Sequence, residues 1–449
     1  MSEKRQNIVV LGGGESGVGA AVLALKKGCD VILSDFGKIS DKYKAELDKY
    51  GVQWEENGHT MERILQADEV IKSPGIPLTA PVIEAVKAKG IPVISEIEYA
   101  ARFTNAKMVC ITGSNGKTTT TLLTYHILKE AGLNVGLAGN VGKSLALQVA
   151  NDDFDIYVIE LSSFQLDNMY DFKADVAVIM NITPDHLDRY DHKFENYVDA
   201  KFRILQNQTA KDAFIYWQDD PVIKKKLDSI TVGATAMPFA EQKQDGTKAY
   251  LEGDNLVVKV ADRTLTMPRA DLALKGLHNL YNSMAAALNA MLVGVEAESV
   301  KHSLSTFRSV EHRLEYVATV DGVRYVNDSK ATNVNSTWYA LESMTTPTVL
   351  ILGGKDKGND YSEIEAFVRE KVKAIVCMGK DNQKLLDFFT GKVEKIADTH
   401  SIEDAINTCR AFATEGDTVL LSPCCASFDL FKSYEDRGEQ FKAIVRGLK

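Results

Sequence analysis

The stretch Val109-Cys110-Ile111-Thr112-Gly113-Ser114-Asn115-Gly116-Lys117-Thr118-Thr119 decides the fold of this chain. An apolar strand leads into a glycine-rich turn, a lysine and two hydroxyls, and a helix-like segment follows over 120–130. Backbone N–H groups in such a turn cradle phosphates, the lysine adds positive charge, and the first hydroxyl binds Mg²⁺. The general pattern requires a glycine where this chain has Ile111. The loop is therefore a variant phosphate loop, which predicts a nucleoside triphosphate site.

Size and composition limit the class of protein. The chain has 449 residues, 45% of them hydrophobic and 25% charged, so we expect two or three soluble globular domains. No apolar run approaches the roughly 20 residues of a membrane span. The polar N-terminus leads straight into a strand, so we expect no signal peptide and a cytoplasmic protein. The net charge of −10 argues against nucleic acid or a membrane surface as a partner.

The six cysteines show no CxxC spacing. Most lie in apolar runs, so buried free thiols in a reducing compartment are the preferred interpretation. Adjacent Cys424 and Cys425 leave a metal or redox site as an alternative. We expect instead one buried and one half-exposed thiol after a strand.

Strands alternate with helix-period segments almost throughout, which indicates an α/β protein with parallel sheets. We predict three domains: a Rossmann-like domain over 1–103, a central phosphate-loop domain over 104–308, and a second Rossmann-like domain over 309–449. The central sheet is expected to be mixed, because residues 249–268 alternate apolar and polar side chains around a hairpin signal, Glu252-Gly253-Asp254-Asn255.

The first predicted domain opens with Gly12-x-Gly14-x-x-Gly17 between a strand and a helix, and Asp35 ends the next strand. This is the context of a dinucleotide fingerprint, although such turns also hold other nucleotides. Asp35 accepts from a sugar hydroxyl or a base N–H in one interpretation and is a solvated strand end in the other. Ser73-Pro74-Gly75-Ile76-Pro77 is a turn by itself, but beside the glycine loop it lines the same crevice.

In the central segment, Glu160 ends a strand near the phosphate loop, where an acid is needed to hold Mg²⁺. The alternative, a helix N-cap region, is already served by Ser162 and Ser163. His186 lies in another loop at the carboxyl end of a strand, and is either a second metal ligand or a structural histidine. Lys201 shares a helix face with the residue four positions before it, and spacing alone makes it a surface lysine.

The last predicted domain places three polar loops after strands, at 327–333, 353–358 and 422–428. Each by itself is a turn, but three such loops in one domain favour a substrate rim. Asn282 lies one helical turn from a His-Asn pair at a helix start, and Arg313 follows the polar, hinge-like residues 309–312.

Together these residues resemble the Mur ligases, which build the peptide stem of bacterial cell-wall precursors. The variant loop is similar to the shifted phosphate loop of that family. The family's other functional positions are matched, in order, by Glu160, His186, Asn282, Arg313 and Asp328. Within the family, residues 327–333 and 73–77 resemble the member that adds D-glutamate. Around Asp35 this chain departs from the family, with Phe36-Gly37-Lys38 in place of a small hydroxyl and a basic residue.

The resemblance implies an ATP-dependent ligase that adds D-glutamate to UDP-N-acetylmuramoyl-L-alanine through an acyl phosphate. It implies catalytic roles for Lys117, His186, Lys201 and Arg313. It implies ATP contacts from Gly113, Ser114, Asn115, Gly116, Lys117, Thr118, Thr119, Asn282, Arg313 and Asp328. It implies two Mg²⁺ ions held by Thr118, Glu160, His186 and a carbamylated Lys201. It implies UDP-substrate contacts from Gly14, Glu15, Ser16, Gly17, Asp35, Gly75 and Asn140. It implies D-glutamate contacts from Lys330, Thr332, Lys357, Ser427 and Phe428.

Small molecules are the expected partners of this ligase, and we expect a monomer. Residues 309–311 are the expected hinge for closure of the last domain. One alternative is another amide ligase similar to folylpolyglutamate synthetase, against which the Gly12 loop and Asp328 argue. A second is an NAD-dependent oxidoreductase, in which the phosphate loop and Glu160 would lack a purpose. A third is a nucleotide-binding switch without enzymatic activity.

Overall fold

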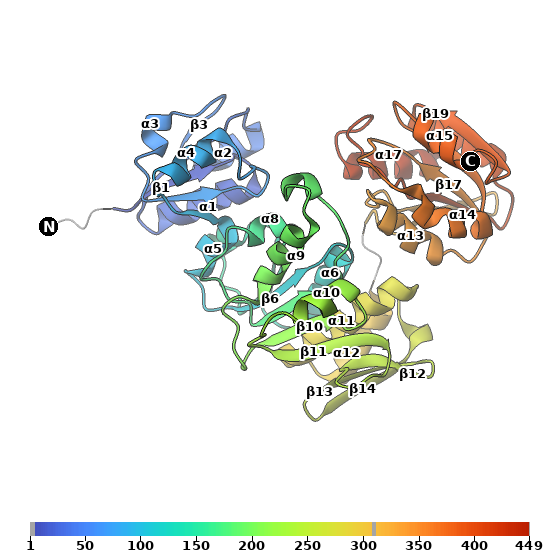
Figure 1. Cartoon of the computed structure of the whole chain (residues 1–449), viewed down its shortest axis with the longest axis horizontal. Coiled ribbons are helices and arrows are strands. Elements are labelled where there is room, and N and C mark those ends of the chain that lie inside the picture. The colour runs from blue at the N-terminus through green and yellow to red at the C-terminus, as the bar shows by residue number, and fades with distance from the viewer. Residues whose placement is uncertain (1–4, 308–310, 449) are drawn as a thin grey trace. The chain divides into compact units, whose positions relative to one another are not determined.

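The computed structural model describes residues 5–307 and 311–448, and three β-sheets organise them (Figure 1). The first sheet is parallel, with the order β3-β2-β1-β4-β5. Its strands are β1 (Asn7–Leu11), β2 (Asp30–Ser34), β3 (Gln53–Glu55), β4 (Glu69–Lys72) and β5 (Val93–Ser95). Its helices are α1 (Glu15–Lys26), α2 (Asp41–Tyr50), α3 (Met61–Ile64), α4 (Pro81–Ala88) and α5 (Glu96–Ala101).

Alternate side chains of the first sheet enter two different cores. Ile8 and Val10 belong to one buried cluster, whereas Val9 and Leu11 belong to another. A strand with both faces buried has a continuous apolar sequence, and that run predicted β1 correctly. The loops after β1, β2 and β4 therefore meet at one edge of the sheet, because these parallel strands are neighbours.

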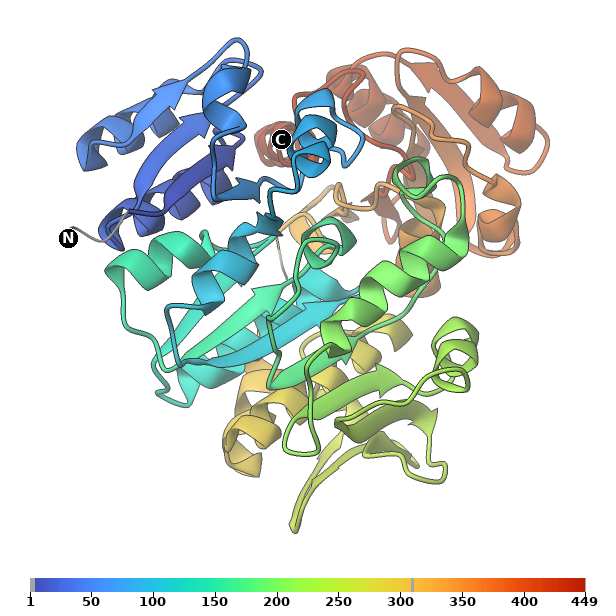
Figure 2. The ribbon, with the colours of Figure 1, turned by 60° about the vertical axis from the view of Figure 1, so that its left-hand side comes forward.

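The central sheet has the order β14-β13-β12-β11-β10-β9-β6-β8-β7. Its strands are β6 (Lys107–Thr112), β7 (Val135–Gly139), β8 (Ile156–Glu160), β9 (Val176–Ile179), β10 (Ala213–Trp217), β11 (Thr235–Gln242), β12 (Ala249–Glu252), β13 (Asn255–Val260) and β14 (Arg263–Pro268). The last three strands pair antiparallel and extend from one edge of the sheet (Figures 1 and 2). Glu252 pairs with Asn255 across a two-residue turn, which confirms the predicted hairpin and the mixed sheet.

Helices and short 3₁₀ turns follow the central strands. They are α6 (Lys117–Glu130), α7 (Leu145–Asn151), α8 (Ser163–Leu166), η1 (Leu187–Arg189), α9 (Phe194–Phe202), η2 (Arg203–Leu205), α10 (Pro221–Leu227), η3 (Arg269–Asp271), α11 (Leu277–Val293) and α12 (Ala297–Thr306). The predicted start of α6 at Thr120 was wrong, because the helix begins at Lys117. Gly116 precedes it in the left-handed conformation, so the lysine already lies in the first turn.

The third sheet has the order β15-β16-β20-β17-β18-β19. Its strands are β15 (Glu315–Val320), β16 (Val323–Asn327), β17 (Thr348–Leu352), β18 (Val372–Met378), β19 (Lys395–Thr399) and β20 (Thr418–Leu421). Its helices are α13 (Val334–Glu342), η4 (Tyr361–Ile364), α14 (Glu365–Lys371), α15 (Gln383–Phe389), α16 (Ile402–Phe412) and α17 (Tyr434–Gly447). β15 is antiparallel to β16, and the other pairs are parallel. Neighbouring β16, β20 and β17 bring the three predicted polar loops to one edge.

The chain forms two compact units, Met1–Asp271 with Tyr281–Ser305, and Leu272–Leu280 with Thr306–Lys449. The first and central sheets share a unit because α1 and α5 both pack on α7. The expected hinge at 309–311 falls largely outside the described residues. Among the described residues, no helix combines the length and the apolar character needed to cross a membrane.

Candidate active site

The phosphate loop has a backbone that only glycine adopts readily. Gly113 and Gly116 have φ angles of 145° and 82°. A Cβ atom at Gly116 would lie 2.5 Å from Oδ1 of Asn282. The same oxygen is 3.2 Å from Thr120 Oγ1 on α6. Asn282 is 166 positions along the chain from Gly116, and α11 places its side chain directly against the loop.

Asn181, directly after β9, fixes the shape of the loop. The Asn115 N–H donates to Asn181 Oδ1 over 2.9 Å, and Asn181 Nδ2 donates back to the Asn115 carbonyl over 3.0 Å. The Ser114 N–H donates to the Asn181 carbonyl, and the Ser114 hydroxyl donates to the Thr183 carbonyl, each over 2.8 Å. The loop is therefore pre-organised by protein groups. Sequence reasoning missed Asn181, although its place after a strand next to β6 was a signal.

Two lysines converge on the phosphate loop. Lys117 Nζ donates to the carbonyls of Gly113 and Ser114 over 2.8 and 2.9 Å. Lys201 Nζ donates to the same Gly113 carbonyl over 2.7 Å, and lies 4.5 Å from the centre of the Tyr197 ring. The shared helix face of Tyr197 and Lys201 is confirmed. Lys201 is only 2% exposed, so the surface-lysine alternative is wrong.

The environment of Lys201 disfavours its charged form. Burial lowers the pKa of its ammonium well below the ordinary value, and the positive charge of Lys117 lowers it further. The negative charges of Asp185 and Glu160 oppose this shift without cancelling it. A neutral lysine amine is the nucleophile that reacts with CO₂, so the site meets the chemical requirement for carbamylation.

Glu160 is the last residue of β8, and its register partner in the sheet is Ile111 of β6, the strand that leads into the phosphate loop. Its side chain is 2% exposed, and Oε1 accepts from Asn140 Nδ2 over 3.2 Å. Oε2 is buried without a hydrogen-bond partner among the described residues. A buried carboxylate oxygen without a donor fits a bound cation, because Mg²⁺ takes oxygen ligands. Ser162 caps α8 in a capping box, so the helix does not need Glu160.

His186 lies in the loop after β9 with a φ of 53°, directly before η1. Its side chain is 43% exposed, and Nε2 is 3.5 Å from Oδ2 of Asp185. The ring meets Phe164 edge-on, with 5.2 Å between the ring centres. This loop thus carries a reachable imidazole beside a carboxylate, and Asp185 is the acid that sequence reasoning did not single out.

The glycine loop of the first sheet is shaped by Asp35. Its carboxylate accepts from the N–H of Gly13 over 2.5 Å and from the N–H of Gly37 over 2.7 Å. Asp35 is therefore not merely a solvated strand end. A Cβ at Gly17 would lie 1.9 Å from the Gly12 carbonyl oxygen, so only glycine fits there. Phe36, beside this loop, is 78% exposed.

The other predicted UDP-substrate residues have different surroundings. Glu15 accepts from the Ser144 N–H over 3.3 Å, and Asn140 contacts Glu160 as described above. Ser16 is half-buried, whereas Gly14 and Gly75 are exposed. Glu15 thus contacts a residue of the central segment, whereas Asn140 contacts a residue of its own central sheet. Gly14 and Gly75 lie in the loops after β1 and β4, and Ser16 lies in the first turn of α1.

Asp328 directly follows β16 of the third sheet, and it is only 5% exposed. It accepts from the Ser422 hydroxyl over 2.8 Å and from the Leu314 N–H over 3.2 Å. Burial raises the pKa of Asp328 to about 7, although these hydrogen bonds and the charge of Arg313 act in the opposite direction. Arg313 Nε is buried without a hydrogen-bond partner among the described residues. A buried guanidinium donor of this kind is suited to bind an anionic ligand.

Arg437 of α17 ties two of the three polar loops together. Its fully buried guanidinium donates to the Ser329 carbonyl over 2.8 Å, to the Ser329 hydroxyl over 2.9 Å, and to the Cys425 carbonyl over 3.3 Å. The third loop joins them because the Lys355 N–H donates to the Ala426 carbonyl over 2.8 Å. Sequence reasoning missed Arg437, which carries no signal beyond its place in a helix-period segment.

The predicted D-glutamate residues all lie on these three loops. Ser427 is buried, Lys330 and Thr332 are half-buried, Lys357 is exposed, and Phe428 is 69% exposed. Cys424 and Cys425 are both free and buried. The expectation of one half-exposed thiol was wrong, because both cysteines pack into the core under the loops.

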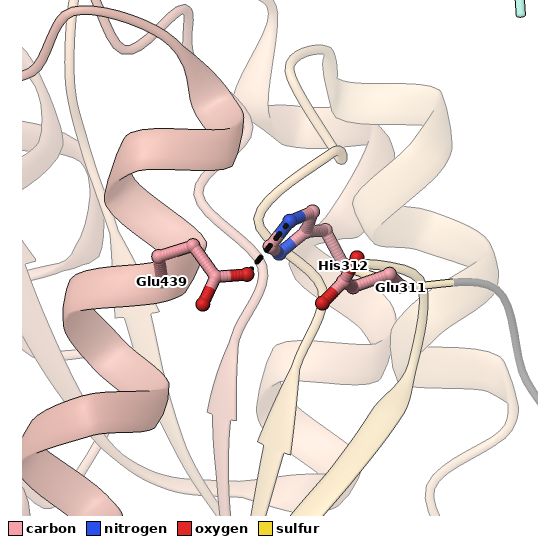
Figure 3. Close-up of side chains that lie close together, drawn as sticks. All are labelled: Glu311, His312 and Glu439. Atoms are coloured by element: carbon pink, nitrogen blue, oxygen red, sulfur yellow. Dashed lines mark ion pairs between the residues drawn. The ribbon is translucent and has the colours of Figure 1, made fainter.

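Glu311, His312 and Glu439 form a cluster with metal-like spacing, which Figure 3 shows between α17 and the segment before β15. His312 Nε2 lies 3.6 Å from Glu439 Oε1. Lys442, which is 3% exposed, pairs with Glu311, and also with Glu439 over 2.7 Å and Glu315 over 3.3 Å. The ammonium group of Lys442 already contacts all three carboxylates and offsets part of their charge, so we interpret the cluster as an ion-pair network that links α17 to β15.

Comparisons with known proteins agree across the whole fold. Residues 6–95 match the family described as "Mur ligase MurD-like, N-terminal domain", residues 111–290 the "Mur ligase middle domain", and residues 312–425 the "Mur ligase, glutamate ligase domain". The solved structure of UDP-N-acetylmuramate-alanine ligase from Thermotoga maritima matches with a TM-score of 0.63 and 17% identity, over 99% of this chain and 100% of that one. It therefore has the same fold.

Two relatives are much closer in sequence. A UDP-N-acetylmuramoylalanine--D-glutamate ligase of Bacteroides fragilis (strain YCH46) is 62% identical over 444 residues, 99% of this chain and 100% of the relative. The enzyme of that name from Porphyromonas gingivalis (strain ATCC BAA-308 / W83) is 57% identical over 450 residues, the full length of both. With three family domains in order and relatives matched end to end, this chain belongs to the Mur ligase family.

Proposed function

We propose that this chain is an ATP-dependent ligase that joins D-glutamate to UDP-N-acetylmuramoyl-L-alanine in the synthesis of peptidoglycan precursors. Relatives that carry the name of this activity are 57% and 62% identical over nearly the whole chain. The single observation that carries the proposal is the contact of Lys201 with the Gly113 carbonyl, because it places a buried lysine of lowered pKa on the phosphate loop.

The phosphate loop, residues 113–119, holds the ATP phosphates through its N–H groups and Lys117. Thr118 and Glu160 would hold one Mg²⁺, and His186 with carbamylated Lys201 would hold the second. The buried, unpartnered Oε2 of Glu160 supports the first assignment. When bound, the two ions supply positive charge that offsets the negative charge of the transferred phosphoryl group.

The reaction activates a carboxylate. A carboxylate oxygen of the L-alanyl group attacks the γ-phosphorus of ATP, and ADP leaves, which gives an acyl phosphate. The neutral amine of D-glutamate attacks the acyl carbon, and inorganic phosphate leaves as the amide forms. The protein supplies position and charge rather than a nucleophile. Asn282, Arg313 and Asp328 position the nucleotide.

The substrates divide among the three domains, with boundaries that we place after 103 and 308. The glycine turn 14–17 with Asp35, Gly75 and Asn140 binds the UDP-substrate. Exposed Gly14 and Gly75 support this assignment. D-Glutamate binds on the polar loops of the third sheet. Its contacts are Lys330, Thr332, Lys357, Ser427 and Phe428. The enzyme acts as a monomer in the cytoplasm on small molecules.

Release of phosphate from ATP tests this function. Phosphate is measured with UDP-N-acetylmuramoyl-L-alanine, with and without D-glutamate, and L-glutamate serves as the matched control. We expect multiple turnovers only when both substrates are present and the glutamate is the D-isomer. Phosphate release that is independent of either substrate would favour a nucleotide switch. An absorbance change with NAD(H) would favour the oxidoreductase.

A further inference from the structure

Two cations hold the loop that follows β4, residues 73–76. Lys72 Nζ donates to the carbonyls at the two ends of the loop, Ser73 over 3.1 Å and Ile76 over 2.9 Å. Arg189, in the loop after β9, donates from its guanidinium to the carbonyls of residues 74–76 over 3.4–3.5 Å. All four carbonyls of the loop thus have a cationic partner, and one of the two partners comes from the central sheet.

This arrangement decides where the loop presents its N–H groups. The described residues contain no cis peptide bond, so each carbonyl and the following N–H point in opposite directions. Pro74 and Pro77 have no N–H. The Ile76 N–H turns inward to the Ser73 carbonyl over 3.2 Å. The Gly75 N–H follows the Pro74 carbonyl, which faces Arg189, so it points away from the guanidinium at an exposed position.

Arg189 is itself held by residues around the proposed metal site. Its guanidinium lies 4.4 Å from the centre of the Phe164 ring, and the same ring meets His186 edge-on. Its neighbour in the chain, Tyr190, donates to Asp167 over 2.9 Å and packs at 5.5 Å on Tyr197. Arg189, which binds the carbonyls of residues 74–76, therefore belongs to the same loop and the same aromatic cluster as His186.

We propose that Arg189 is a positioning residue that orients the Pro74–Gly75 peptide, so that the Gly75 N–H donates to the diphosphate of the UDP-substrate. This inference rests on the proposed function. Lys72 and Arg189 together also place two positive charges behind the loop, which favours a diphosphate in front of it. The loop that carries His186 thereby sets the position of a substrate group bound by the first sheet.

Binding measured without ATP tests the role of Arg189 apart from catalysis. The dissociation constant of UDP-N-acetylmuramoyl-L-alanine is measured by calorimetry for the full-length wild type and for Arg189→Lys. Lysine keeps the positive charge but lacks the planar guanidinium group, which donates to the carbonyls of residues 74–76 at once. The matched control is Arg102→Lys, since Arg102 pairs with Glu69 in the same unit and makes no hydrogen bond to the loop. ATP affinity and the melting temperature are measured for each variant.

We expect Arg189→Lys to weaken binding of the UDP-substrate about tenfold, with ATP affinity unchanged. Phe164→Leu removes the ring under the guanidinium and should give a smaller loss of the same kind. An equal loss in Arg102→Lys, or a loss of ATP affinity as large as that of the UDP-substrate, would overturn the inference. If the wild type binds the UDP-substrate and Arg189→Lys binds it equally tightly, the role of Arg189 is overturned while the proposed function stands. A wild type that does not bind the UDP-substrate would overturn the proposed function as well.

Discussion

Lys201 Nζ donates a 2.7 Å hydrogen bond to the carbonyl of Gly113, the first glycine of the phosphate loop. The two residues are 88 positions apart in the chain, and α9 brings them together inside the protein. Because burial and Lys117 lower the pKa of Lys201, this amine loses its proton far more readily than a surface lysine.

Removal of Lys201 should abolish ligation, and a small carboxylate should restore part of it. Lys201→Ala leaves space beside the loop, and acetate supplies the carboxylate that we assign to the carbamate. The measurement is phosphate release with both substrates at increasing acetate. The matched control is Lys117→Ala, which should be equally inactive but not rescued, because an anion cannot replace its cation. Full activity of Lys201→Ala without acetate would contradict the carbamate role.

Glu160→Gln should raise the Mg²⁺ concentration needed for half-maximal activity by about tenfold or more. The amide keeps the size of the side chain, and its oxygen still accepts from Asn140, but the buried negative charge is lost. The measurement is a magnesium titration at saturating ATP and substrates. An unchanged magnesium requirement would remove Glu160 from the set of metal ligands.

Glu96 lies in the contact between the first and central sheet regions, and its ionisation should make the stability of that contact depend on pH. It accepts from the Ser144 hydroxyl over 2.7 Å and from the Ala146 N–H over 2.6 Å, and burial raises its pKa to about 7. The folded protein binds more protons here than the unfolded chain, whose glutamates titrate near pH 4.3, so this contribution to stability falls between about pH 4 and 7.

Glu96→Gln should therefore match the wild type near pH 4 and melt higher at pH 8. The amide oxygen still accepts both hydrogen bonds, and it does so without a buried charge. The expected gain is on the order of a few degrees, measured by differential scanning calorimetry across this range. A difference between the two proteins that stays constant from pH 5 to 8 would refute this account.

Arg437→Met should destabilise the third sheet's unit by about 3 kcal/mol, because buried carbonyl groups lose their donor. It should also raise KM for D-glutamate more than KM for ATP, since the two loops that Arg437 joins carry the proposed D-glutamate residues. Urea unfolding and initial rates test both effects. Arg446→Met, on the exposed part of the same helix, is the control and should change neither quantity.

Local patterns predicted most of the fold. The continuous apolar run of β1, the glycine-lysine turn before α6 and the two-residue hairpin turn after β12 each act over a few residues, so the sequence displays them. Gly113, Lys117 and Glu160 were found for the same reason. Arg437 and Asn181 were not, because what they bind is set by packing. Arg437 is 108 positions from Ser329, and Asn181 is 66 from Asn115.

Transfer of oxygen tests the central claim, activation of a carboxylate on the phosphate loop, most directly. UDP-N-acetylmuramoyl-L-alanine labelled with ¹⁸O in its carboxylate is incubated with the enzyme, ATP, Mg²⁺ and D-glutamate, and the products are analysed by mass spectrometry. We predict one labelled oxygen in the released inorganic phosphate, together with ADP and the D-glutamyl product. Label in AMP, or phosphate released without label while the amide forms, would contradict the account.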